Sequence, residues 1–220
     1  MLEEKKLGIK DKILIVGLPK SGTSTLTVML RILGYSVTGP SPVNNNKFLD
    51  KEFEKFNAFQ DYPWCFEYKY LLEKHNMKII VLKREPLKWA NSFKKNFGGN
   101  GINYNCYNYL EISKNEPDYK FVEYHEDYYY DAIKFLNTKG FSYLKIDLEN
   151  LNWKDICQFL QKPIPKNAFG FTTKIPKTNS NNHKKKRFYF KFIKLLKKIA
   201  LSALGKNYLK FSALYHKNKL

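Results

Sequence analysis

An apolar run followed at once by a glycine-containing loop and a helical pattern is the most constraining feature of this chain. Residues 13–16 read Ile-Leu-Ile-Val, which is typical of a strand buried in a parallel sheet. The loop 17–24 follows, with the sequence Gly-Leu-Pro-Lys-Ser-Gly-Thr-Ser. Apolar residues then recur at helical spacing, at Leu26, Met29, Leu30 and Leu33. Gly34 ends that pattern, so the segment predicts a strand, a loop and a helix.

Later segments repeat this alternation. Further strands are predicted over 35–38, 78–83 and 141–146, and helices over 64–75, from Pro86 onward, over 123–138 and over 153–160. Residues 40–60 are polar and give no assignment. We therefore expect an α/β fold, a three-layer α/β/α arrangement with a mostly parallel, P-loop-like central sheet. In such folds ligands gather at the carboxyl ends of the strands, so the loops after Val16, Lys83 and Ile146 should line one cleft.

Positive charge is concentrated in the last part of the chain. The net charge is +19, from 39 Lys and Arg against 20 Asp and Glu. Twelve of these cations, and no Asp or Glu, lie beyond residue 182. We expect a folded domain over 1–178 and a basic linker with an amphipathic helical tail over 179–220. A field of this sign favours anionic partners such as nucleotides, acidic glycans or anionic lipid.

The predicted tail helix has one apolar face, formed by Phe188, Phe192, Leu195, Leu196, Ile199 and Ala203. A basic amphipathic helix of this kind suits an anionic membrane surface. The alternative is a terminal helix that packs on the domain and exposes its lysines. No apolar run near the start resembles a signal peptide, and none of about 18 residues is present to span a bilayer. We expect a cytoplasmic protein, with peripheral contact to the inner membrane surface as a further expectation.

The cysteines indicate reduced thiols rather than disulfides or a metal site. Cys65, Cys106 and Cys157 are odd in number, far apart and without metal-ligand spacing. No metal is expected.

The loop after the first strand has the composition of an anion-binding site. The first amides of a helix lack intrahelical partners, and the helix dipole adds partial positive charge there. The nucleoside-triphosphate motif places Lys directly after its second Gly. Here Thr23 occupies that position, and the lysine is Lys20, before Gly22. The strand over 78–83 is followed by Arg84 rather than by an acidic magnesium ligand, which favours metal-free binding of negative charge.

Two spaced motifs resemble those of the sulfotransferases that use 3′-phosphoadenosine 5′-phosphosulfate (PAPS). The first is the loop Pro19-Lys20-Ser21-Gly22-Thr23-Ser24, and the second comprises Arg84, Pro86 and Ser92. The similarity extends over residues 12–175, including Asp61-Tyr62-Pro63 and Trp89. It implies that the loop binds the 5′-phosphosulfate and that Arg84 and Ser92 bind the 3′-phosphate.

A basic stretch that many members carry near the C-terminus has no plain match here. Lys174, Lys177 or residues 184–187 are the candidates to replace it.

Sulfuryl transfer needs charge stabilisation and a base, as phosphoryl transfer does. Lys20 is the candidate to stabilise the leaving phosphate oxygen. Asp61 is the candidate general base, its alternative being a cap for the helix expected near Trp64, and Glu67 is the second choice. His125 and Tyr128-Tyr129-Tyr130 either contact the acceptor or pack along a helix face, and the latter is favoured.

The predicted function is therefore transfer of a sulfuryl group from PAPS to a hydroxyl or amine of an acceptor, such as a glycan or small molecule. PAPS is the co-substrate and 3′-phosphoadenosine 5′-phosphate (PAP) the product. The alternatives are a P-loop small-molecule kinase and a non-catalytic protein that binds an anionic ligand such as RNA or lipid. Nucleic acid is not expected as the main partner.

Overall fold

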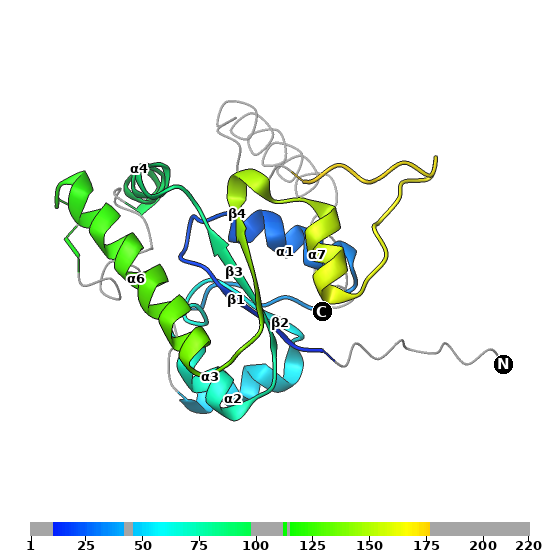
Figure 1. Cartoon of the computed structure of the whole chain (residues 1–220), viewed down its shortest axis with the longest axis horizontal. Helices are drawn as coiled ribbons and strands as arrows, with labels where there is room; N and C mark the ends of the chain where they lie inside the picture. The colour runs from blue at the N-terminus through cyan, green and yellow to red at the C-terminus, as the bar shows by residue number, and fades with distance from the viewer. Residues whose placement is uncertain (1–10, 42–45, 98–111, 114, 177–220) are drawn as a thin grey trace, which may run out of the picture. The chain divides into compact units, whose positions relative to one another are not determined.

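The computed structural model describes residues 11–41, 46–97, 112–113 and 115–176 (Figure 1). Four parallel strands form one sheet in the order β2-β1-β3-β4. They are β1 (Ile13–Val16), β2 (Ala58–Phe59), β3 (Lys78–Lys83) and β4 (Tyr143–Asp147). Ile13 lies opposite both Ala58 and Lys78, so β1 is central and its carboxyl end faces the same edge as that of β3. The loops that follow β1 and β3 are therefore neighbours.

Helices cover both faces of this sheet and give the predicted three layers (Figure 1). They are α1 (Thr23–Ile32), α2 (Asn46–Lys55), α3 (Tyr68–Lys74), α4 (Pro86–Phe97), α6 (Asp118–Thr138), the short 3₁₀ helix η1 (Leu148–Asn150) and α7 (Trp153–Leu160). Side chains of β1 alternate between two cores, as the period of a strand requires. Leu14 and Val16 pack with α2, α3, α4 and α6, whereas Ile13 and Ile15 pack with α1 and α7.

Several predicted boundaries needed correction. The segment 35–38 forms only an isolated bridge from Val37 to Ala58, because the neighbouring β2 is two residues long. The helix expected over 64–75 is confined to α3, and turns precede it. Residues 40–60, left unassigned, contain α2 and β2. Only Leu49 and Phe53 of α2 are buried, so charged neighbours masked its apolar face.

Other boundaries shifted by a few residues. The helix predicted over 123–138 begins earlier, at Asp118, after the extended residue Pro117. The strand predicted over 141–146 is β4, Tyr143–Asp147.

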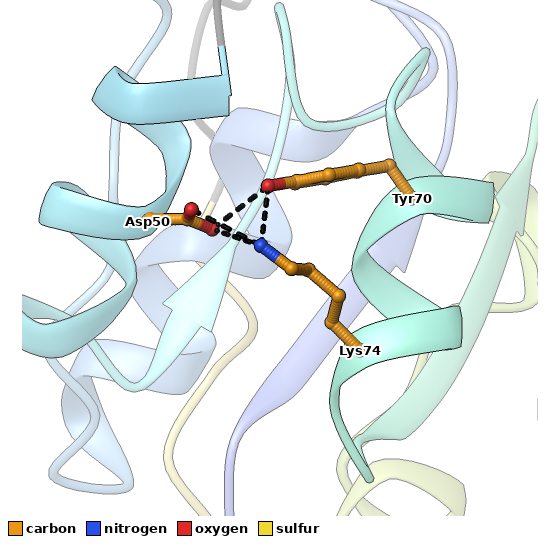
Figure 2. Close-up of polar contacts among 3 residues, drawn as sticks. All are labelled: Asp50, Tyr70 and Lys74. Carbon is orange, nitrogen blue, oxygen red and sulfur yellow. Dashed lines mark hydrogen bonds and ion pairs between the residues drawn. The ribbon is translucent and has the colours of Figure 1, made fainter.

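A polar contact joins α2 to α3 on the surface (Figure 2). The Lys74 ammonium lies 3.1 Å from both carboxylate oxygens of Asp50, and the Tyr70 hydroxyl donates to the same carboxylate over 3.0 Å. These groups are exposed, so solvent screening limits their contribution to stability. The His75 ring, directly after α3, also stacks on Phe53 of α2, at 3.7 Å between ring centroids.

None of the described helices has the length and apolar character needed to span a membrane. The predicted tail over 179–220 and its apolar face lie outside the described residues, as does Cys106, and the boundary near residue 178 stays a prediction.

Candidate functional site

Tyr129, in the middle of α6, holds the loop between β1 and α1 by hydrogen bonds. The Tyr129 hydroxyl accepts a hydrogen bond from the Leu18 amide over 3.2 Å and lies 3.0 Å from the Ser21 hydroxyl. It also donates to the carbonyl of Leu82, in β3, over 2.7 Å. Tyr129 is buried, and it thereby ties two points of the loop to the end of the adjacent strand.

Two further side chains hold the residues between those points. The indole of Trp89, on α4, donates to the carbonyl of Pro19 over 2.7 Å. The guanidinium of Arg84, directly after β3, donates to the carbonyl of Lys20 over 3.1 Å. The two motifs predicted to bind one ligand are therefore in direct contact, as the carboxyl ends of neighbouring parallel strands require.

The backbone of this loop adopts conformations that side chains rarely allow. Lys20 has φ of 75° and Gly22 has φ of 97°. A Cβ atom on Gly22 would lie 2.3 Å from Cδ1 of Leu148, in η1, so this position excludes a side chain on two grounds. Gly22 is the N-cap of α1, and its carbonyl accepts from the Thr25 amide over 2.9 Å. The helix N-terminus thus opens directly from the strained loop, a geometry that suits an anion.

The charges of Lys20 and Asp61 influence each other's pKa. Burial lowers the pKa of the half-buried Lys20 ammonium; Asp61 opposes the shift, and Arg84 acts with it. Burial raises the pKa of the Asp61 carboxyl above its ordinary value, against the stabilising effects of the Tyr62 amide, the Thr23 hydroxyl and the Lys20 charge. The two groups therefore influence each other in a partly desolvated setting.

Asp61 is held by both its backbone and its side chain. Its carboxylate accepts from the Tyr62 amide over 2.9 Å and from the Thr23 hydroxyl over 3.3 Å. Its carbonyl accepts from the Cys65 amide over 2.9 Å, and its φ is 64°, in the left-handed region. The carboxylate thus shapes its own turn and also reaches the first residue of α1. Glu67, the second choice for a base, lies at the N-cap of α3.

Pro86 and Ser92 of the second motif lie on the first two turns of α4. The Glu85 carboxylate accepts from the amides of Leu87 and Lys88, over 2.9 Å and 2.7 Å, and these bonds lower the pKa of Glu85. The Glu85 side chain therefore caps the first turn of α4. Ser92 is half-buried one turn further on, and its carbonyl accepts from the Asn96 side chain over 2.7 Å. Its predicted contact with a 3′-phosphate stays a prediction.

Ser21 differs from what its place in the motif predicts. It is fully buried, and its amide donates to the carbonyl of Leu18 over 3.1 Å while its hydroxyl meets Tyr129. Ser21 is one of the loop residues predicted to hold the donor, but its hydroxyl and its amide are both directed into the protein. Ser24 lies exposed on the first turn of α1.

Sequence reasoning missed the residues that support the loop. Trp89 is fully buried, and its indole donates to the loop. His125 and Tyr129 are buried, in agreement with packing along a helix face, whereas Tyr130 is 65% exposed. The missed signal is a polar residue within the buried stripe of α6, formed by Phe121, His125, Tyr129, Ala132 and Leu136. A buried hydroxyl needs a partner, but the sequence does not say which one.

The remaining candidates are placed as follows. Lys174 is exposed, while Lys177 and residues 184–187 lie outside the described residues. Cys65 and Cys157 are buried and form no disulfide. Within the described part of the chain, no group of three His, Cys, Asp or Glu side chains is arranged to hold a metal ion.

The sequence of this chain matches a known protein family. A family model described as a sulfotransferase domain matches residues 12–137, more than half of the chain. That range contains both motifs, Asp61 and Tyr129. The search of curated proteins found no match.

Solved structures with a similar arrangement include two nucleotide-binding proteins. One is mouse sulfotransferase SULT7A1 complexed with PAP, at 20% identity and a TM-score of 0.45, covering 73% of this chain and 60% of that one. Another is deoxyadenosine kinase from M. mycoides with bound dATP, at 16% identity and a TM-score of 0.42, covering 69% of this chain and 97% of that one. This chain thus spans about 60% of the length of the mouse protein.

Proposed function

Since the chain belongs to the sulfotransferase family, we propose that it transfers a sulfuryl group from PAPS to an acceptor hydroxyl or amine. A glycan or a small molecule is the expected class of acceptor. The observation that carries this proposal is the contact between the Arg84 guanidinium and the Lys20 carbonyl, which brings together the two motifs predicted to bind the phosphates.

Donor binding follows from the electrostatics of the two strand ends. The amides at the start of α1, beginning after Gly22, and the ammonium of Lys20 would hold the 5′-phosphosulfate. Arg84 and Ser92 would hold the 3′-phosphate. A planar guanidinium suits a phosphate because it donates two parallel hydrogen bonds. Arg84 donates from Nη1 to Lys20, so it is already oriented at the edge of the loop.

The transfer step breaks the bond between sulfur and the bridging oxygen of the 5′-phosphate and forms a bond from sulfur to the acceptor atom. Negative charge develops on the leaving phosphate oxygen, where the Lys20 ammonium stabilises it. The acceptor proton passes to the Asp61 carboxylate, which is the proposed general base. A raised pKa makes this carboxylate a stronger base than an exposed one, which supports the assignment.

The first experiment compares ligands by their effect on thermal stability. The full chain is titrated with PAP, and separately with ATP, with magnesium and with EDTA. We expect PAP to raise the melting temperature by the same amount with magnesium and with EDTA, because the predicted site uses no metal. A preference for ATP with magnesium would instead identify a kinase.

The second experiment follows sulfur from labelled PAPS into a panel of hydroxyl- and amine-bearing acceptors. Lys20→Ala should reduce transfer about 10² to 10³-fold, the typical cost of losing one charge-stabilising donor, while part of the PAP affinity persists. Transfer by this variant at the wild-type rate would remove the assignment.

The location and the membrane contact are also proposals, supported by the basic amphipathic pattern of the tail. We propose that the protein lies in the cytoplasm and that its tail binds the inner, anionic membrane surface. Deleting residues 183–220 should abolish sedimentation with vesicles that contain phosphatidylserine. Unchanged sedimentation would exclude the tail as the membrane contact.

A further inference from the structure

The hydroxyl of Tyr129 is the point at which three separate segments meet. It lies within hydrogen-bond distance of the Leu18 amide at 3.2 Å, the Ser21 hydroxyl at 3.0 Å and the Leu82 carbonyl at 2.7 Å. Leu18 and Ser21 precede it by 111 and 108 residues. All four residues are buried, so these bonds form where water is excluded. No water molecule is therefore at hand to replace a hydrogen-bond partner that is lost.

Counting protons fixes the direction of each bond. A phenol has one proton to donate and oxygen lone pairs that accept two further bonds. The Leu82 carbonyl only accepts, so the phenol proton points to Leu82. The Leu18 amide only donates, so it uses one lone pair. The Ser21 hydroxyl must therefore donate its own proton to the remaining lone pair of Tyr129.

Ser21 is consequently left without a donor for a ligand. Its hydroxyl proton points to Tyr129, and its amide proton points to the carbonyl of Leu18 over 3.1 Å. Burial raises the pKa of Tyr129 above its ordinary value, so the phenol stays protonated and the direction of the three bonds persists at every pH of interest.

We propose that Tyr129 is a positioning residue that fixes the donor loop, and that Ser21 acts through Tyr129 rather than by contacting the donor. The proposal rests on the function proposed above. Lys20 lies between the two residues that Tyr129 holds, and its φ of 75° is an unfavoured conformation for a lysine. The three bonds hold that conformation, and they thereby set the position of the ammonium relative to the leaving oxygen.

The first test measures the loop itself and does not depend on PAPS. Amide hydrogen exchange is followed by NMR in the full chain for Leu18 and Ser21. Tyr129→Phe keeps the ring but removes the hydroxyl, and it should accelerate exchange of the Leu18 amide at least about 10-fold.

Tyr128→Phe is the matched control. It removes a neighbouring hydroxyl of the same helix, one that donates to the Cys65 carbonyl over 2.6 Å. This variant should leave exchange at Leu18 and Ser21 unchanged. Equal exchange in wild type and Tyr129→Phe would overturn the proposal.

The second test is a double-mutant cycle on transfer from PAPS with Ser21→Ala, Tyr129→Phe and the double variant. If Ser21 acts through Tyr129, each single variant lowers kcat about 10- to 100-fold, and the double variant loses little more than the worse single one. If Ser21 instead donates to the donor phosphate, Ser21→Ala raises the KM for PAPS and the two losses multiply, which contradicts the proposal.

The two tests separate failure of this proposal from failure of the proposed function. A wild-type protein that binds neither PAP nor PAPS would refute the function, yet the exchange experiment would still decide whether Tyr129 fixes the loop. Should Tyr129→Phe fail to fold, Ser21→Ala by itself gives the same decision, because it removes one of the three bonds and leaves Tyr129 in place. Accelerated exchange at Leu18 in Ser21→Ala supports the proposal, and unchanged exchange contradicts it.

Discussion

The guanidinium of Arg84 donates a hydrogen bond of 3.1 Å to the carbonyl oxygen of Lys20, 64 residues earlier in the chain. This contact brings two cations to the carboxyl ends of β1 and β3, which are adjacent in the sheet. A ligand with two separated phosphates is the kind that such a pair of sites would hold.

Replacing Arg84 should therefore affect the 3′-phosphate more than the rest of the nucleotide. We expect Arg84→Ala to weaken PAP binding about 10- to 100-fold, the range for hydrogen bonds to charged groups, while 5′-AMP binding changes much less. Isothermal titration calorimetry with both ligands measures this. Arg31→Ala is the control, because Arg31 bonds the Val37 carbonyl instead. Equal losses for the two nucleotides would contradict the assignment.

Replacing Asp61 should remove the proposed general base and leave the proposed donor site in place. Asp61→Asn should lower kcat about 10² to 10⁴-fold and change PAP affinity little. The carboxylate accepts a proton only when it is ionised, and burial raises its pKa above the ordinary value of 3.8. The wild-type rate should therefore rise with pH through a pKa above that value, and this acid limb should be absent in Asp61→Asn. The pH profile of kcat/KM, recorded at saturating PAPS, measures this acid limb. An acid limb that is unchanged in Asp61→Asn would exclude Asp61 as the titrating base.

Gly22→Ala tests the two causes of strain in the loop. The added Cβ would clash with the Leu148 side chain at 2.3 Å, and a residue with φ of 97° carries a backbone penalty of about 1–2 kcal/mol. Gly140→Ala is the matched control, because Gly140 also has positive φ, 71°, but a Cβ there would meet nothing within 4 Å. Urea unfolding should show a larger loss of stability for Gly22→Ala. Equal losses would mean that Leu148 moves aside without cost.

His125 should make stability depend on pH. Burial lowers its pKa from 6.5 to about 4, Lys83 acts in the same direction, and the Arg84 backbone and Glu85 oppose the shift. The unfolded chain therefore binds the proton more readily between these values, so stability should fall as pH falls from 6.5 to about 4, by about 3 kcal/mol in all. Urea unfolding at several pH values measures this.

His125→Phe is the companion variant for that measurement. The phenyl ring keeps an aromatic contact with Trp89 and Tyr129, whose rings lie 5.1 Å and 4.7 Å from the imidazole. It cannot titrate, so the dependence on pH in this window should become shallower. An equally steep dependence in His125→Phe would assign the effect to other groups.

Much of the fold follows from local patterns. The apolar runs at β1 and β3 are continuous and bounded by turn residues, so their burial was predictable. The isolated bridge at Val37 was not, because its pairing depends on a partner strand of two residues. In α2 the charged residues outnumber the two buried ones, so periodicity gave too weak a signal.

The loop motif and Arg84 were identifiable because each follows a buried strand and parallel strands end at one edge. The sequence by itself therefore predicted the α/β fold class and the placement of Lys20 and Arg84 at one edge of the sheet, and phosphate binding at that edge stays a prediction. Only the tertiary structure decided that Tyr129 and Trp89 support the loop and that Ser21 turns inward. The reason is physical: a buried hydroxyl or indole must find a hydrogen-bond partner, but which partner lies beside it depends on how distant helices pack.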